Sequence, residues 1–138
     1  MSVDLDEPVL LMDDWVEVTV LDTHDAGDKV GVAGQFFKEI TIKPEYQASR
    51  YLLMVEASVK NLTSKNLRIA AGMLAMKDQN GAAVEIAGAC FKRDDFCGGS
   101  IGAKLEPHDT MTAYFVFAAP NELDQFTLIL LGVKEWKK

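Results

Sequence analysis

The chain has few of the side chains with which enzymes bind metals or carry out nucleophilic chemistry. Its 138 residues include two cysteines and two histidines. Neither histidine stands in a recognisable nucleophile motif, and the P-loop and H-E-x-x-H patterns are absent. Covalent hydrolysis needs a nucleophile activated by a neighbouring base, which no pattern here supplies. The sequence therefore predicts a protein that is not an enzyme and that uses no cofactor.

Long apolar runs and an excess of basic residues are also missing. No run approaches the roughly 18 to 20 apolar residues that cross a bilayer as a helix. Acidic residues outnumber basic ones by 21 to 14, which gives a formal net charge of −7. A negative field repels phosphate backbones and anionic lipid head groups. We therefore expect no nucleic acid partner, no binding to membrane surfaces and no transmembrane segment.

The N-terminus has neither the basic start nor the small-residue cleavage site of a signal peptide. We expect residues 1–13 to form an acidic, irregular lead-in. Removal of an export signal or a lipid anchor would leave a segment of this kind. The length of the remainder, 14–138, suits a single domain with a real core. We expect this domain to be extracytoplasmic, secreted or anchored to the cell envelope through a removed N-terminal segment, with a cytoplasmic protein as the alternative.

The dominant hydrophobic period is two, which is typical of half-buried strands. The segments 15–22 (WVEVTVLD) and 50–61 (RYLLMVEASVKN) alternate most clearly, and EITIK, AAVEIAG, MTAYFVFAAP and QFTLILLGV add further strands. MTAYFVFAAP is apolar on both faces, as in the middle of a packed sheet. The residues predicted to form the shared core include Val18, Val55, Val59, Phe115, Phe117 and Leu128.

The segment 67–78 (LRIAAGMLAMKD) has a composition that also suits a helix. We interpret it as a strand because Gly72 disfavours a helix and Asn80-Gly81 is a strong hairpin signal. Strands separated by turn signals at near-regular spacing predict an all-β fold: an antiparallel immunoglobulin-like β-sandwich of about seven to eight strands, with a β-barrel as the alternative.

Several of these elements together resemble the DUF4352 family of bacterial immunoglobulin-like domains. The resemblance covers about residues 15–133 and is carried by the strand ending at Lys60-Asn61, the MKDQNG hairpin and the LEPHDTMTAYFVFAAPNE segment. The usual Pro-Gly turn reads Pro107-His108 here, and no lipid-attachment cysteine precedes the domain. Because the family occurs in secreted proteins and lipoproteins and has no settled activity, the resemblance implies a fold and an envelope location.

Both cysteines lie in the stretch CFKRDDFC, as Cys90 and Cys97. This spacing is too long for a C-x-x-C redox motif, and a structural zinc site would need His24 and His108 as further ligands. If the flanking segments are adjacent strands or the two ends of a tight loop, the two Cα atoms approach to disulfide distance, and we expect a Cys90–Cys97 disulfide. Two reduced, buried cysteines in a cytosolic protein are the alternative.

The same stretch is the candidate binding element. Aromatic side chains beside the cysteines enclose charges of both signs, and a disulfide would reduce the ordering entropy lost on binding. Alternatively, the two phenylalanines cap the core and the charges solvate an ordinary hairpin tip. The candidate residues are Phe91, Lys92, Arg93, Asp94, Asp95 and Phe96.

Two metal sites can be considered. Asp22, His24, Asp25 and Asp28 form an acidic cluster in an expected loop, but the EF-hand pattern is absent, and a solvated loop is the simpler interpretation. Met73, Met76 and Met111 with His108 contain soft copper ligands, although methionines on strands usually fill cores. We therefore assign no metal site.

These observations predict a non-enzymatic extracytoplasmic binding or accessory module. We expect its partner to be a protein or another envelope component; the sequence indicates neither the partner's identity nor the oligomeric state. The alternatives are a small secreted enzyme or inhibitor and a metal-carrying envelope protein.

Overall fold

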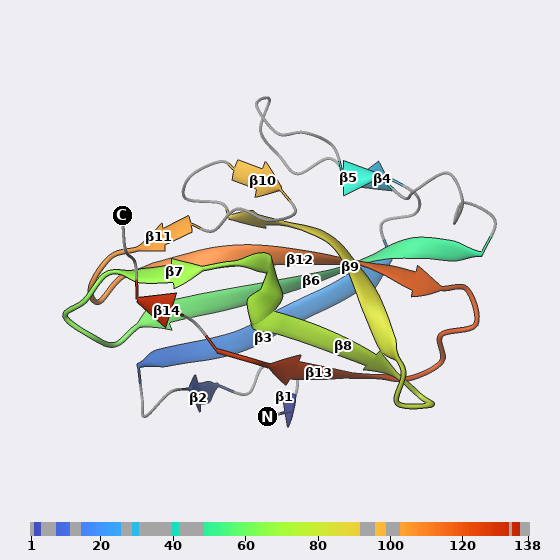
Figure 1. Cartoon of the computed structure of the whole chain (residues 1–138), viewed down its shortest axis with the longest axis horizontal. Helices are drawn as coiled ribbons and strands as arrows, with labels where there is room; N and C mark the ends of the chain where they lie inside the picture. Colours follow the sequence, from blue (N-terminus) through green and yellow to red (C-terminus); the bar gives the residue numbers. More distant parts are fainter. Residues whose placement is uncertain are drawn as a thin grey trace.

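The computed structural model describes residues 2–3, 8–11, 15–25, 29–30, 40–41, 49–91, 96–98, 103–132 and 134–135. It shows an antiparallel β-sandwich (Figure 1). The strands are β1 (Ser2–Val3), β2 (Val9–Leu11), β3 (Val16–Asp25), β4 (Lys29–Val30), β5 (Ile40–Thr41), β6 (Arg50–Asn61), β7 (Leu67–Ile69), β8 (Leu74–Asp78), β9 (Ala83–Phe91), β10 (Phe96–Gly98), β11 (Ala103–Leu105), β12 (Thr110–Pro120), β13 (Phe126–Leu130) and β14 (Lys134–Glu135).

The strands form two layers. In the first, β12 lies between β6 and β9, and β3 and β2 extend the sheet beyond β6. The second contains β8, β13 and β1 together with the small sheet β11-β7-β14, and it crosses in front of β12, β6 and β3 in Figure 1. Strand β9 connects the layers, because it pairs with β8 at Ala83 and Val84 and with β12 from Glu85 to Phe91.

The core lies between the layers, where the alternation of apolar residues places it. Val16, Val18 and Val20 of β3 are buried, and all six residues predicted for the shared core belong to one buried cluster. Strand β12 is buried on both faces around Phe115–Ala119. The predicted all-β sandwich is confirmed.

The N-terminal stretch contributes two edge strands, where an irregular lead-in over 1–13 was expected. Strand β1 pairs with β13 in one layer, and β2 pairs with β3 in the other. Strands of two or three residues are too short to produce a recognisable alternation, so the pattern could not reveal them. The sheets thus begin before residue 14.

The segment 67–78 is not one continuous strand. A 3-10 helix, η2 (Ala71–Met73), separates β7 from β8 and begins with a hydrogen bond from the Met73 amide to the Ala70 carbonyl (3.1 Å). After this turn the buried positions shift in phase, and Leu74 and Met76 face the core. The strand prediction holds on both sides of η2, whereas the prediction of one continuous strand over 67–78 was wrong.

The hairpin between β8 and β9 forms where the Asn80-Gly81 signal predicts it. The Gly81 amide donates to the Asp78 carbonyl (3.0 Å), and the Asp78 carboxylate accepts from the amides of Asn80 and Ala82 (2.9 Å each). Gly81 has φ +80°, which only glycine adopts without strain. Because Asn80 has no positive φ, the turn is centred one residue before the Asn-Gly pair.

The turn before β12 has a non-glycine residue in a left-handed conformation. The Asp109 amide donates to the Glu106 carbonyl (3.2 Å), Pro107 is the second residue, and His108 has φ 60°. A positive φ at the third position is the signature of a type II turn, where glycine is preferred. Having His108 in place of the usual glycine therefore costs conformational free energy in this turn.

We expect His108→Gly to stabilise the protein by roughly 0.5 to 1 kcal/mol. Relief of the left-handed strain, about 1 to 2 kcal/mol, is partly offset by the larger conformational entropy of glycine in the unfolded chain. Thermal unfolding should show a midpoint raised by a few degrees. His108→Ala is the control, because it removes the imidazole and keeps the strain; an equal rise in both variants would assign the effect to the imidazole instead.

Candidate functional site

The two cysteines face each other across a hairpin. Strand β10 pairs antiparallel with β9, and Cys97 is the direct partner of Cys90 in the register. Directly opposed Cα atoms lie about 4.5 to 5.5 Å apart, which is within the range of a disulfide. Cys90 is buried, and no free cysteine occurs among the described residues. The Cys90–Cys97 disulfide stays a prediction, and this geometry favours it.

The hairpin does not present both phenylalanines as surface anchors. Phe91 is 0% exposed and belongs to the core, because it pairs with the inward-facing Ala113 of β12. Its assignment as an exposed binding residue was wrong. Lys92, Arg93, Asp94 and Asp95 lie outside the described residues, and Phe96 is described only as the first residue of β10.

The acidic cluster expected in a loop lies mostly in a strand. Asp22, His24 and Asp25 belong to β3, and Asp28 lies outside the described residues. Asp22 pairs with Glu56 and Asp25 with Leu53, so their positions alternate between the two faces of the sheet. Burial, and then the charge of Asp25, raises the pKa of Tyr51, which places Asp25 near that ring. The prediction of a loop was therefore wrong over Asp22–Asp25, which belong to β3.

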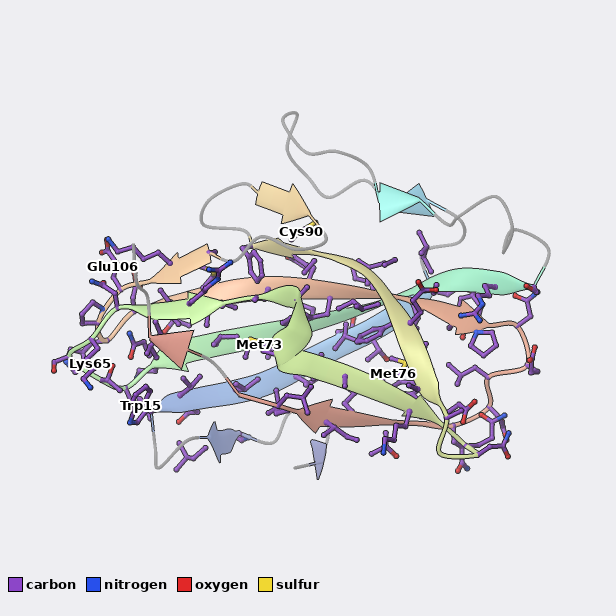
Figure 2. All side chains as sticks on the ribbon, in the orientation of Figure 1. Trp15, Lys65, Met73, Met76, Cys90 and Glu106 are labelled. Atoms are coloured by element: carbon purple, nitrogen blue, oxygen red, sulfur yellow. The ribbon has the colours of Figure 1, made fainter. Side chains whose placement is uncertain are left out.

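The methionines fill the core. Met73, Met76 and Met111 are buried there, whereas His108 is exposed in its turn. In Figure 2, Met73 is labelled on η2 and Met76 on β8, in the layer that lies in front of β12, β6 and β3. Within the described part of the chain, no group of three metal-ligating side chains of the His, Cys, Asp and Glu types comes together.

A polar surface that the sequence interpretation did not single out lies on the outer face of β3, β6 and β12. A bulge between Val20 and Asp22 inserts Leu21 into β3, so Asp22 pairs with the outward-facing Glu56. Without this extra residue, Asp22 would continue the inward row of Val16, Val18 and Val20. The bulge therefore moves a carboxylate from the core side to the surface.

Nine residues in three cross-strand rows make up this surface, which we call the polar sheet face. One row is charged at two positions, the next carries three hydroxyls, and the third carries two carboxylates and a phenol. Asp22, Lys60 and Thr110 are exposed and the others are half-buried. In order, the rows are Glu17, Lys60 and Thr110; Thr19, Ser58 and Thr112; and Asp22, Glu56 and Tyr114.

The polar sheet face has a boundary. Farther along the same outer side, Leu52, Val116 and Ala118 are buried although they do not belong to the main core cluster. Other parts of the chain therefore cover that end of the sheet, and β5 contacts β9. In the sequence, the alternate polar residues Glu56, Ser58 and Lys60 indicate a solvent-facing side of this strand. The alternation does not show which strands lie beside it, so the sequence alone could not predict the polar sheet face.

At one end of the sandwich, Asn61 joins two loops. Its side-chain amide nitrogen donates to the carbonyls of Lys65 (2.7 Å), Leu105 (3.1 Å) and Glu106 (3.1 Å). Its oxygen accepts from the amide and the hydroxyl of Thr63 (2.9 and 2.7 Å). Nearby, the Lys65 ammonium lies 5.1 Å from the centre of the Trp15 ring (Figure 2). Asn61 is 0% exposed, so it is a structural residue.

One short motif also escaped the sequence interpretation. Gly98-Gly99-Ser100-Ile101-Gly102 fits the G-x-S-x-G pattern of serine hydrolases. That motif works as a turn from a strand into a helix, which exposes the serine. Here Gly98 ends β10, residues 99–102 lie outside the described residues, and Ala103 begins the strand β11. The required helix does not follow, so the match has no structural support.

Comparison with known proteins identifies the fold. No family model and no curated protein matches the chain. An uncharacterized β-sandwich protein of Clostridium difficile 630 matches with a TM-score of 0.66 and 12% identity over 98% of this chain and 93% of the other. The yjhA protein of Bacillus subtilis has a TM-score of 0.59 and 15% identity, covering 93% and 79% of the respective chains.

A third structure, a conserved hypothetical protein of Bacillus anthracis, has a TM-score of 0.56 and 16% identity over 99% of this chain and 96% of that one. Identities this low establish a shared β-sandwich fold and nothing about activity. No helix in the described part of the chain is long and apolar enough to cross a membrane.

Proposed function

We propose that the chain is a non-enzymatic, extracytoplasmic binding or accessory module of the DUF4352-like immunoglobulin type. Its partner is a protein or another component of the cell envelope. The observation that carries the proposal is the direct cross-strand register of Cys90 and Cys97. Disulfides persist in oxidising compartments and are rare in the cytosol, so a cysteine pair placed to form one favours an exported domain.

A Cys90–Cys97 disulfide would also support a binding role for the hairpin. Closing so short a loop would stabilise the fold by about 2 to 3 kcal/mol through the entropy of the unfolded chain. It would also fix the two strands that lead to the tip, which lowers the ordering cost of binding. With Phe91 in the core, the binding element of the proposal is the charged tip, Lys92 to Asp95.

Capture from an envelope extract tests the hairpin. We expect a component bound by the oxidised wild type to be depleted about tenfold on Lys92→Ala/Arg93→Ala, because the tip loses both of its cations. The matched control is Lys77→Ala/Lys104→Ala, which removes two exposed cations from β8 and β11. Undiminished capture by the folded tip variant, or equal loss in the control, would rule out the tip as the binding element.

A further inference from the structure

We propose that the polar sheet face is a docking surface for a basic peptide segment of a partner protein. This surface ends beside the Cys90–Cys97 hairpin, because Tyr114 is the cross-strand partner of Cys90, but it does not include the residues of the tip. It adds a second site and a partner chemistry to the proposed binding role, and it does not depend on the hairpin's own function. The charges, the register and the exposed fractions of its nine residues carry the inference.

The central observation is a pair of like charges in direct register. Asp22 of β3 and Glu56 of β6 are cross-strand partners. Directly opposed side chains on one face of a sheet have Cβ atoms about 4.5 to 5.5 Å apart, and like charges at this distance destabilise the sheet. The bulge at Leu21 creates this pairing, because it turns Asp22 onto the face that already presents Glu56. Sheets usually avoid like charges at directly opposed positions, and such exceptions are expected at functional sites, where a bound partner can offset the repulsion.

Within the described part of the chain, no basic group neutralises this pair. The Glu56 carboxylate makes no hydrogen bond or ion pair there, and the oxygen of Asp22 accepts only from the adjacent Thr23 amide (2.8 Å). Lys60 is the cross-strand partner of Glu17, and it lies four residues, about 13 Å, along the strand from Glu56. The face therefore carries three carboxylates and one ammonium group.

This arrangement selects a cationic partner. A basic side chain between Asp22 and Glu56 would replace repulsion by two attractive contacts, whereas a neutral or anionic ligand would leave the repulsion in place. The hydroxyls of Thr19, Ser58 and Thr112 form the adjacent row and can donate to or accept from a peptide backbone. Tyr114 is the half-buried cross-strand partner of Glu56, and an aromatic ring at this position can attract an Arg or Lys side chain.

The size of the surface sets the length of the segment. Three strands are about 10 Å across and three alternate rows span about 13 Å, which matches four or five residues of extended peptide. Nucleic acids and anionic membranes share the sign of the face and are disfavoured. A neutral glycan is the competing occupant, because sugar hydroxyls also bind carboxylates and hydroxyls.

Nuclear magnetic resonance titration of the oxidised full chain with a lysine–serine octapeptide tests the proposal. We expect the largest shifts at the backbone amides of the polar sheet face, and about tenfold weaker binding to Asp22→Asn/Glu56→Gln. The matched control is Glu122→Gln/Asp124→Asn. It removes the same two carboxylate types from exposed positions of the loop between β12 and β13, and it should change affinity by less than about twofold.

Thermal unfolding provides a readout without ligand. Asp22→Asn removes one charge of the repelling pair and should raise the unfolding midpoint by roughly 1 to 4 °C. A lowered midpoint would contradict the repulsion on which the inference rests. If the test and control variants lost peptide affinity equally, the binding would depend on the overall net charge of −7 and not on the polar sheet face. Absence of shifts, or stronger shifts with a soluble neutral glucan than with the peptide, would overturn the proposal.

Discussion

Replacing Asn61 by Ala should lower the free energy of unfolding by about 3 to 5 kcal/mol. The amide nitrogen of Asn61 satisfies the carbonyls of Lys65, Leu105 and Glu106, and its oxygen accepts from Thr63. Each buried polar group left without its partner costs about 1 to 3 kcal/mol, moderated where water can enter the loops. Urea unfolding followed by circular dichroism measures the change.

Asn61→Asp should cost at least as much at neutral pH, because a carboxylate oxygen would replace the nitrogen that donates to three carbonyl oxygens. Asn66→Ala is the matched control in the same loop and should cost less than about 1 kcal/mol. Near-wild-type stability of Asn61→Ala would show that the two loops do not depend on this side chain.

Replacing Phe117 by Ala should lower the free energy of unfolding by about 3 to 5 kcal/mol. Phe117 is 1% exposed in the middle of β12, where it pairs with Leu53 of β6 and Ile86 of β9. Truncation removes buried apolar surface and leaves a cavity that neighbouring strands cannot fully close. The midpoint of chemical denaturation should fall accordingly.

The control for this change is Thr112→Ala, which alters the same strand on its outer face. Its cost should stay within about 1 kcal/mol, since little apolar surface is lost. If the two variants were equally stable, Phe117 would not be part of a tightly packed core.

The sheets and the core were predictable because alternation is a local property. Val16, Val18 and Val20 face inward as their spacing predicts, and so do Leu53, Val55 and Val59 of β6. The doubly apolar pattern of β12 also indicated its central place between two neighbours. Period two fixes which residues share a face, and burial of that face fixes the register.

What the sequence did not reveal depends on single-residue irregularities. The bulge at Leu21 reverses the face of Asp22, and η2 interrupts the strand after Ile69; neither changes the local composition. Phe91 follows a second irregularity, where β9 shifts register against β12 between Val116 and Phe117. A pattern that counts residues in twos assigns the wrong face beyond such a point.

The candidate site was predictable only in part. The pairing of Cys90 with Cys97 follows from a short hairpin, which the sequence already allowed. The polar sheet face forms only because β3, β6 and β12 are neighbours in the sheet, and the local sequence pattern does not indicate which strands pair. In the sequence, Asn61 resembles an ordinary turn residue at the start of Asn61-Leu62-Thr63. Its structural role depends on hydrogen bonds to the carbonyls of Leu105 and Glu106, more than 40 residues away, which the sequence does not show.

The most direct test of an extracytoplasmic location is the oxidation state of Cys90 and Cys97 in the protein isolated from its own cells. Alkylation of the unfolded, unreduced protein followed by peptide mass spectrometry distinguishes a disulfide from two thiols. An extracytoplasmic domain should give a single peptide pair linked through Cys90 and Cys97, with no alkylated cysteine. Two fully alkylated cysteines would contradict this location, because a domain that functions in an oxidising compartment with these residues in direct register should not retain free thiols.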